Sequence, residues 1–265
     1  MLNPQITMEL VARCKTVASQ FELFRMRSLA GLPGNPMDVE IRQFGAATAF
    51  IAHRAPTCRF ANFVTGIELE RIPEIVQFYR TSNASLHFEL TPADLTPEIG
   101  SMLSKHSIYQ YGFGSTLLRL PQSQQILSPE IQVRHVGPDM LDVFIETSSC
   151  GSNLEGELAT MVKASQQSWL AIPHWHLYLA TVDGVPAGAS VLAIKDRIGV
   201  LSFASTTPAY RKRGCQTAMI RARLSAAAQL DCEFVMATAV YGATSFKNLQ
   251  RLEFQVVYTQ ARWKE

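Results

Sequence analysis

The stretch from residue 200 to residue 230 constrains the fold most, because it joins a strand to a long helix through a short basic turn. Residues 200–206 are apolar or small and indicate a buried strand. The turn Arg211-Lys212-Arg213-Gly214 follows, and a helix comes after it. The predicted core-facing residues of this helix, at helical spacing, are Ala218, Ala222, Ala226 and Leu230. This order of elements predicts an α/β layer in which a helix begins at the end of a strand.

The basic turn has the features of an anion site. The first turn of a helix offers main-chain N–H groups without intrahelical partners, together with the positive end of the helix dipole. Gly214 has no Cβ to hinder a phosphate, and Arg211, Lys212 and Arg213 add positive charge. We therefore expect a pyrophosphate to bind here. The alternative is a solvated basic turn whose glycine serves only its backbone angles.

The rest of the chain also alternates strands with helices, which indicates an α/β protein. Predicted helices lie at 6–29, 72–81, 97–106, 138–148, 154–170, 214–230 and 245–252. Predicted strands lie at 38–44, 47–53, 60–69, 86–90, 113–120, 131–135, 174–182, 187–195, 200–205, 234–239 and 256–263. The polar segment 121–125 indicates a linker, so we predict two domains, 1–125 and 126–265. The similar order of elements in the two domains predicts a diverged repeat.

Composition and charge exclude several classes of protein. The chain has 265 residues, 47% of them hydrophobic and 17% charged, with a net charge of +2, so we expect a globular protein with no nucleic-acid partner. The five cysteines form no Cys-x-x-Cys pair, so we expect reduced thiols, no metal site and a cytoplasmic location. Charges between Glu9 and Arg27 interrupt any signal-peptide core, and apolar runs such as 46–52 are too short to cross a membrane.

The turn and its helix resemble motif A of the GNAT acetyltransferase superfamily, Arg/Gln-x-x-Gly-x-Gly/Ala. Arg211 and Gly214 match this motif. Gln216 stands where the family has glycine or alanine, so its side chain must point away from the phosphates or join the site. Residues 178–188 are similar to the family's hairpin of second and third strands, with a turn at Asp183-Gly184.

The segment 245–254 resembles the family's last motif. Asn248, Arg251 and Phe254 match it, and Glu253 replaces the usual glycine. The resemblance covers roughly residues 130–265, in a consistent motif order.

The first half more faintly resembles the degenerate first repeat of tandem GNAT proteins, in segments 44–49 and 62–66. It has no basic glycine turn, because Gly66 is followed by Glu68 and Glu70, which would repel a phosphate. The resemblance therefore implies two GNAT-like α/β subdomains, each a twisted mixed, mainly antiparallel sheet flanked by helices. It also implies one coenzyme per chain.

The resemblance implies an N-acetyltransferase that transfers an acetyl group from its cosubstrate, acetyl-CoA, to the amine of a small molecule or peptide by direct attack in a ternary complex. A main-chain N–H near Ala204 would face the thioester oxygen. The residues implied to contact the coenzyme are Ala204, Ser205, Thr206, Arg211, Lys212, Arg213, Gly214, Cys215, Gln216, Thr217 and Asn248. Such a protein needs neither a metal nor a membrane, and could form a homodimer.

The general base is not marked by a motif. No carboxylate occurs between residues 198 and 206, where many relatives place one. Glu155 and Glu157, in the helical region that usually frames the acceptor, and His176 are candidates, although we favour a solvated or structural role for each. His174 and His176 share a strand face but lack a third ligand, so we do not expect them to bind a metal.

The general acid is also unmarked, because Leu249 stands where the family often has a tyrosine. Tyr241 and Tyr258 are the candidate substitutes. Cys215 at the helix N-terminus could act as a nucleophile, but we favour a packing role for it.

Two other classes of function are considered. Leu249, Gln216 and the missing strand carboxylate also fit a non-catalytic acyl-CoA-binding or regulatory module. A dinucleotide oxidoreductase is not expected, because no Gly-x-Gly-x-x-Gly follows a first strand.

Overall fold

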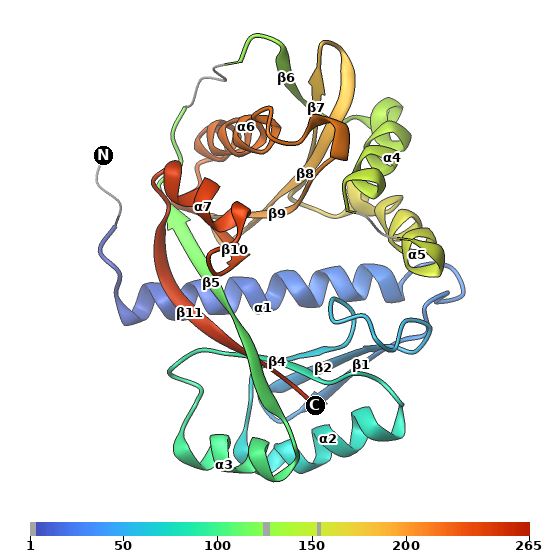
Figure 1. Cartoon of the computed structure of the whole chain (residues 1–265), viewed down its shortest axis with the longest axis vertical. Coiled ribbons are helices and arrows are strands. Elements are labelled where there is room, and N and C mark those ends of the chain that lie inside the picture. Colours follow the sequence, from blue (N-terminus) through green and yellow to red (C-terminus); the bar gives the residue numbers. More distant parts are fainter. Residues whose placement is uncertain (1–3, 124–127, 153–154) are drawn as a thin grey trace. The chain divides into compact units, whose positions relative to one another are not determined.

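The computed structural model describes residues 4–123, 128–152 and 155–265, which form two compact units (Figure 1). The C-terminal unit contains the residues up to Phe21 together with Leu117–Val257. The N-terminal unit contains Glu22–Thr116 and Tyr258–Glu265. Each unit therefore combines two segments that are separated in the sequence, and each contains one end of the chain. The predicted domain boundary near residue 125 lies outside the described residues.

The C-terminal unit contains a sheet with strand order β6-β7-β8-β9-β10. Its strands are β6 (Ile131–His135), β7 (Trp175–Val182), β8 (Val185–Lys195), β9 (Ile198–Thr206) and β10 (Phe234–Val240). Strands β6 to β9 are antiparallel, whereas β9 and β10 are parallel. Helix α6 (Cys215–Gln229) joins the parallel pair, because parallel neighbours need a crossover connection.

The other helical elements are short, apart from α1 (Met8–Ala30) at the beginning of the chain. In the C-terminal unit they are α4 (Leu141–Ser152), α5 (Gly156–Gln166), α7 (Thr244–Arg251) and the 3₁₀ helices η2 (Pro138–Met140), η3 (Trp169–Ala171) and η4 (Pro208–Tyr210). Within the described residues, no helix combines the length and the hydropathy needed to cross a bilayer.

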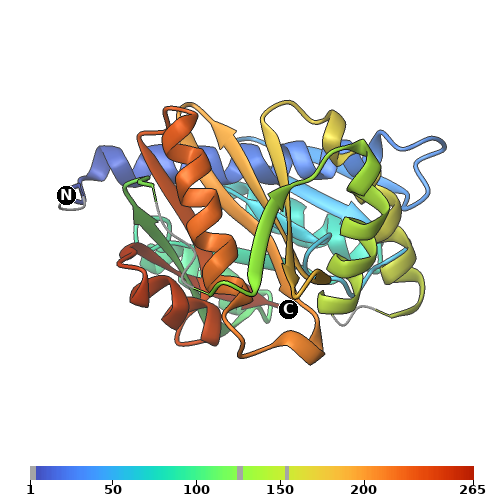
Figure 2. The ribbon, with the colours of Figure 1, turned by 90° about the horizontal axis from the view of Figure 1, so that it is seen from above.

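Helices cover both faces of this sheet (Figures 1 and 2). Helix α6 packs across strands β6 to β10, and its Leu224 lies in one apolar cluster with Tyr178 of β7. Helix α4 packs against β8 and β9, beside a cluster of aromatic rings. The rings of this cluster belong to Phe21, Phe144, Trp169, Trp175 and Phe203. Because Trp175 and Tyr178 are an odd number of residues apart on one strand, the two clusters lie on opposite faces of the sheet.

The buried face of α6 differs from the predicted one. Leu230 is 45% exposed, and Ala222 and Ala226 are only partly buried. The buried residues are Cys215, Ala218, Met219, Ile220, Arg223, Leu224 and Ala227. The predicted stripe was wrong because alanines lie on every side of this helix and give little apolar contrast, while a charged residue, Arg223, lies within the true core face.

The N-terminal unit contains strands in the order β1-β2-β3-β4, followed by β11 and β5. Its strands are β1 (Val39–Phe44), β2 (Ala47–Ala52), β3 (Phe63–Thr65) and β4 (His87–Leu90), with residues of β5 (Tyr109–Arg119) and β11 (Gln255–Lys264). Strands β1 to β3 are antiparallel, and β3 is parallel to β4. The helices are η1 (Leu69–Arg71), α2 (Ile72–Thr81) and α3 (Pro97–Lys105).

Helix α2 supplies much of the core of the N-terminal unit. Its Ile72, Ile75 and Tyr79 are all fully buried. The Tyr79 hydroxyl lies 2.8 Å from the Phe50 carbonyl oxygen and 2.7 Å from that of Phe63, so its one hydrogen can bond to either and fasten the helix to β2 or β3. The strand predicted at 60–69 is shorter than expected, because the chain turns at residues 58–61 before β3 begins.

The two units repeat one topology. The order β1-β2-β3-α2-β4-α3-β5 in the first matches β7-β8-β9-α6-β10-α7-β11 in the second, with three antiparallel strands and then a parallel one. The last strands are exchanged: β11 lies beside β4, and β5 lies beside β10. The predicted tandem α/β organisation, with mixed and mainly antiparallel strands flanked by helices, is confirmed.

Because of this exchange, a residue at the very end of the sequence should stabilise the N-terminal unit. Trp263 of β11 pairs with Phe88 of β4 and packs against the core that contains α2. We expect Trp263→Ala to lower the free energy of unfolding by about 2–4 kcal/mol, since the large ring leaves a cavity. Hydrogen exchange followed by mass spectrometry should show faster exchange in α2 and β4.

Trp263→Phe, which keeps most of the ring volume, is the control and should have a smaller effect. Faster exchange confined to β7–β10 would contradict this assignment of β11.

Candidate functional site

Strand β9 contains one more residue than the matching stretch of β8. Val191 of β8 pairs with Ser202 of β9, and the next regular pair is Ala189 with Ser205. Between these two pairs the chain advances by two residues in β8 but by three in β9. Phe203 lies in this irregular stretch with a φ of 48°, in the left-handed region. Such a β-bulge interrupts the hydrogen-bond ladder and redirects the strand that contains it.

Strand β9 also separates from β10. Their parallel register ends at Leu201 and Ala237, although β9 continues to Thr206 and β10 to Val240. Within the described residues, the end of β9 has no paired strand on this side. Ala204 is exposed in this stretch. The main chain at 202–206 is therefore an open strand edge, which can pair with an extended ligand that carries amide groups.

The basic turn follows β9 directly and is held to it. Arg211 donates from Nε to the Thr206 carbonyl at 3.2 Å and from Nη2 to the Gly151 carbonyl at 3.3 Å. Lys212 and Gly214 have φ values of 64° and 93°. A Cβ on Gly214 would meet its nearest neighbour atom at 3.6 Å, an ordinary contact. The left-handed backbone, rather than crowding by the protein, is what requires glycine here.

The first turn of α6 presents main-chain amides that have no acceptor in the helix. The first intrahelical bond runs from the Ala218 N–H to the Gly214 carbonyl at 3.0 Å, and the N-cap residue, Gly214, has no side chain with which to cap the helix. The amides of residues 215–217 are therefore available to a ligand. Arg213 lies beside them, with its Nη2 3.6 Å from a carboxylate oxygen of Asp183. This end of the helix favours an anion.

The side chain of Gln216 is bonded to the later motif. Its Oε1 accepts a hydrogen bond from Asn248 Nδ2 at 2.6 Å, and Asn248 Oδ1 accepts one from Arg251 Nη1 at 3.0 Å. Gln216, the residue that departs from GNAT motif A, therefore has a hydrogen-bond partner on α7. Gln216 and Asn248, predicted separately as coenzyme contacts, lie together.

Cys215 is buried in an apolar cluster with Ala187 and Ala218. Its Sγ lies 3.7 Å from the Tyr210 carbonyl. Burial raises the pKa of the Cys215 thiol, with smaller effects from nearby charges. A raised pKa disfavours the thiolate that a nucleophile needs, so the environment of Cys215 is that of a packing residue.

The candidate bases lie in different surroundings. Glu155 is exposed immediately before α5, and the side chain of Glu157 is outside the described part of the structure. Burial lowers the pKa of His176, and the nearby His135 and His174 lower it further, so its neutral form is favoured at neutral pH. Among the described residues, no group of three or more metal-binding side chains is arranged to hold an ion.

The candidate acids belong to different units. Tyr241 follows β10 in the C-terminal unit and is 61% exposed, with its ring 5.1 Å from that of Phe246. Tyr258 belongs to the segment of β11 that is part of the N-terminal unit. Leu249 of α7, which stands where the GNAT family often has a tyrosine, is buried in the apolar core.

The end of helix α4 borders the candidate site, although no motif in the sequence predicts this. The Ser205 hydroxyl donates to the Ser148 carbonyl at 3.3 Å, and Arg211 bonds to Gly151. A Cβ on Gly151 would lie 2.7 Å from Ser205 Cβ and 3.0 Å from the Thr206 nitrogen. Helix α4 therefore approaches β9 more closely than any other residue type would permit. The run of small residues at 147–152 was the available signal.

The matching turn of the N-terminal unit has the opposite charge. The carboxylate of Glu68 accepts the Ala46 N–H at 2.6 Å and would lie 2.1 Å from a Cβ on Gly45. Helix α2 has Pro73 and Glu74 in its first turn. A proline there removes an amide donor, so this helix end is poorly suited to a phosphate.

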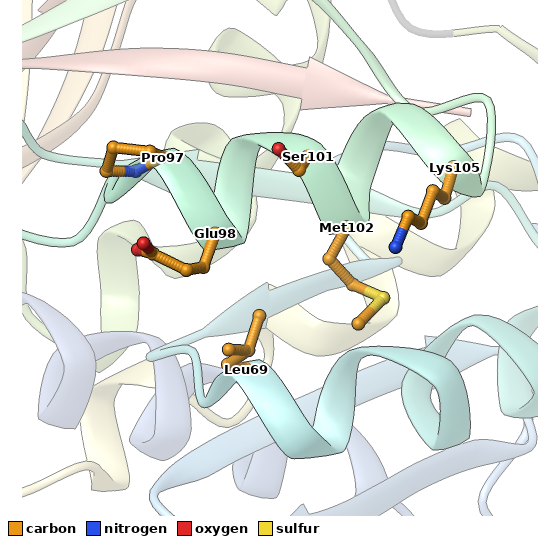
Figure 3. Close-up of a pocket in the computed structure, with 6 residues that line it drawn as sticks. All are labelled: Leu69, Pro97, Glu98, Ser101, Met102 and Lys105. Carbon is orange, nitrogen blue, oxygen red and sulfur yellow. The ribbon is translucent and has the colours of Figure 1, made fainter.

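A surface hollow of about 310 Å³ lies elsewhere in the N-terminal unit (Figure 3). Its lining comes mainly from α3, with one residue from η1: Leu69, Pro97, Glu98, Ser101, Met102 and Lys105. Its lining includes one carboxylate and one ammonium group. It shares no residue with the turn and strand edge described above.

The fold is that of GNAT N-acetyltransferases. A GCN5-related N-acetyltransferase from Sphaerobacter thermophilus superimposes with a TM-score of 0.64 at 11% identity, over 90% of this chain and 83% of the other. One from Kribbella flavida gives 0.60 at 13% identity, over 91% and 95%. A tandem GNAT protein from the clavulanic acid biosynthesis pathway gives 0.63 at 13% identity, over 91% and 87%.

The likeness extends over nearly the whole chain and therefore includes both repeats. At these identities it concerns the fold alone. No known protein-family profile matches the sequence, and no curated protein matches it.

Two glycine-to-alanine changes should have opposite effects on stability. Gly151→Ala places a methyl group against Ser205 and Thr206, and we expect it to destabilise the protein by about 1–3 kcal/mol. Gly100→Ala in α3 meets no atom within 4 Å. It should stabilise the protein by about 0.5–1 kcal/mol, because alanine is the better helix former. Urea unfolding measures both. A neutral or stabilising Gly151→Ala would mean that α4 is not held against β9.

Proposed function

We propose that the chain is an N-acetyltransferase that transfers the acetyl group of acetyl-CoA to an amine by direct attack in a ternary complex. The observation that carries this proposal is the continuous surface made by the open edge of β9, the left-handed basic turn and the first turn of α6. The GNAT fold supports an acyltransferase, and this surface supports coenzyme A as the carrier of the acyl group.

In this proposal the pyrophosphate of the coenzyme lies at the basic turn. The amides of residues 215–217 donate to its oxygens, and Lys212 and Arg213 balance its charge. Arg211 has a different role, because its guanidinium bonds to the Thr206 and Gly151 carbonyls and so holds the turn in place. Asn248 and Gln216 border the same end of the helix.

The pantetheine arm then extends along β9. Its amides are suited to pair with the main chain at 204–206, where β10 has diverged. The thioester would lie near the bulge, with the N–H near Ala204 directed at its oxygen. Losing one such oxyanion donor typically costs on the order of 10²–10³ in rate.

The acceptor in this proposal is the amine of a small molecule or peptide. Its nitrogen attacks the thioester carbon, the C–S bond breaks, and the thiolate takes up a proton while the amine loses one. An amine with a pKa near 10.4 is neutral in only about one molecule in 10³ at pH 7, so a base is needed. Glu155 is the candidate base, and Tyr241 and Tyr258 are the candidate acids.

The leucine at position 249 favours a second candidate function, a non-catalytic acyl-CoA-binding module, because it has no phenol that could act as a general acid. Incubating the protein with acetyl-CoA and a broad panel of amines separates the two functions. Thiol release that depends on an amine supports the transferase. Binding of acetyl-CoA without thiol release across the panel supports the module.

Acetyl-CoA should stabilise the protein through the basic turn, since a ligand at 100 times its Kd adds about 2.7 kcal/mol. We expect Gly214→Glu to abolish the rise in melting temperature, because it places a carboxylate at the phosphates. Gly34→Glu is the matched control, since Gly34 also has a positive φ of 75° and open space around it, but lies in the N-terminal unit. If Gly214→Glu responds to acetyl-CoA like the control, the turn is not the phosphate site.

One acetyl-CoA should bind per chain. Glu68 and Glu70 replace the basic residues in the N-terminal unit, and each carboxylate near a pyrophosphate would oppose binding by about 1–4 kcal/mol at 4 Å. The helix dipole, worth about 0.3–1 kcal/mol, does not offset this. Calorimetric titration measures the stoichiometry, and a value near two would overturn the expectation.

Direct attack predicts that Cys215 is dispensable. Cys215→Ala should keep most of the acetyltransferase activity, because burial raises the pKa of the thiol and so disfavours a thiolate nucleophile. The matching measurement is mass spectrometry of the wild-type protein after mixing with acetyl-CoA. Loss of activity in the variant together with an acetylated Cys215 in the wild type would establish a thiol intermediate instead.

A further inference from the structure

A positively charged side chain lies inside the core behind the bulge of β9. Arg223, on the sheet-facing side of α6, is 1% exposed. Within the described residues it forms no ion pair, and its hydrogen bonds go to main-chain carbonyls. Burial lowers the pKa of its guanidinium to about 9. Burying a charge costs free energy unless hydrogen bonds satisfy it. The acceptors of Arg223 therefore show which part of the sheet its side chain stabilises.

The carbonyls that Arg223 reaches mark one point in the sheet. Its Nη1 donates to the Val191 carbonyl at 2.9 Å and to the Ser202 carbonyl at 3.4 Å. Val191 and Ser202 are register partners, and theirs is the last regular pair of β8 and β9 before the bulge. Nε donates to the Met219 carbonyl, one turn back on the same helix, at 3.0 Å. The guanidinium is therefore fixed to α6 at one end and to both strands at the other.

These bonds favour the bulged register over the regular one. A bulge disrupts the ladder, and buried carbonyls that lose a ladder partner need another donor. Without the extra residue, every side chain of β9 after Ser202 would move to the opposite face of the sheet. Phe203 would then leave the aromatic cluster that contains Trp169, whose ring is 4.5 Å from its own. The main chain at Ala204 would be redirected as well.

We infer that Arg223 is a positioning residue of acyl transfer: it holds the bulge of β9 in the register that presents the Phe203–Ala204 main chain to the thioester. This inference rests on the proposed function. Arg223 would act through the backbone and would not touch acetyl-CoA, whose phosphates are assigned to residues 212–217 on the outer side of the turn.

The test compares Arg223→Met, which keeps most of the side-chain volume but cannot donate, with Arg223→Lys, which keeps the charge but not the fork of donors. Leu224→Ala is the matched control, because Leu224 is the next residue of α6 and is also fully buried but forms no bond to the bulge. The measurements are hydrogen exchange of β9, calorimetric binding of acetyl-CoA, and amine-dependent thiol release. The infrared carbonyl frequency of bound ¹³C-labelled acetyl-CoA is also measured.

Arg223→Met should increase exchange in the second half of β9 beyond that seen in Leu224→Ala. Affinity for acetyl-CoA should stay within about threefold, while thiol release falls by about 10–100-fold, as expected when an oxyanion donor is misplaced rather than lost. The thioester carbonyl band should move back toward its frequency in free acetyl-CoA. Arg223→Lys should lie between Arg223→Met and the wild type, and Leu224→Ala should keep the wild-type band.

Unchanged exchange in β9, or an equal loss of thiol release in Leu224→Ala, would overturn the inference. If Arg223→Met does not fold, Arg223→Lys decides by the same measurements. Failure of both variants to fold would assign Arg223 to fold stability alone and reject a positioning role. A wild-type protein that binds no acetyl-CoA would refute the proposed function instead, and the exchange of β9 would still show whether Arg223 holds the bulge.

Discussion

Strand β9 is paired on both sides only over its first residues, and the candidate site depends on this partial pairing. Up to Leu201 the strand lies between β8 and β10, with its backbone groups satisfied by the sheet. Beyond that residue it bends at the bulge and leaves β10. The basic turn and helix α6 begin where the strand ends, so an open strand edge, a cation-rich turn and a helix N-terminus follow one another without interruption. Each feature alone is common, whereas their continuity suits a long ligand with amides at one end and phosphates at the other.

Several unusual packing contacts maintain this arrangement. Gly151 allows α4 to approach Ser205, and Arg211 joins the end of α4 to the end of β9. On the other face, Arg223 bonds to the carbonyls where the ladder is interrupted. These contacts act on the backbone of β9 rather than on a ligand, so the geometry of the edge is set before anything binds. Such preorganisation is where much of the catalytic effect of an oxyanion donor originates.

The two repeats share one topology but have side chains of opposite charge in equivalent turns. Both repeats contain three antiparallel strands, a helix and a parallel strand, but the C-terminal turn has Arg211, Lys212 and Arg213 where the N-terminal one has Glu68 and Glu70. The carboxylate of Glu68 lies beside Gly45 and accepts a hydrogen bond from the Ala46 N–H. A carboxylate of the protein therefore occupies a position that a bound anion could otherwise use. The exchange of β5 and β11 makes each repeat depend on the other for its last strand. The two turns differ in charge, although the strands and helices around them follow the same order.

Local features of this protein can be predicted from its sequence alone. The limits of α2 (Ile72–Thr81), β8 and α6 were predictable to within about two residues, because apolar periodicity, proline and glycine act over one or two turns of chain. The basic glycine turn could be identified for the same reason, since its charge and its backbone freedom belong to four adjacent residues. The tertiary structure decided the features that join distant residues: the exchange of β11 into the N-terminal unit, the approach of Gly151 to Ser205 and the bond between Gln216 and Asn248. It also placed Arg223 in the core, where hydrophobic patterning predicts leucine or alanine, because main-chain carbonyls beside the bulge accept its hydrogen bonds and offset the cost of burying its guanidinium.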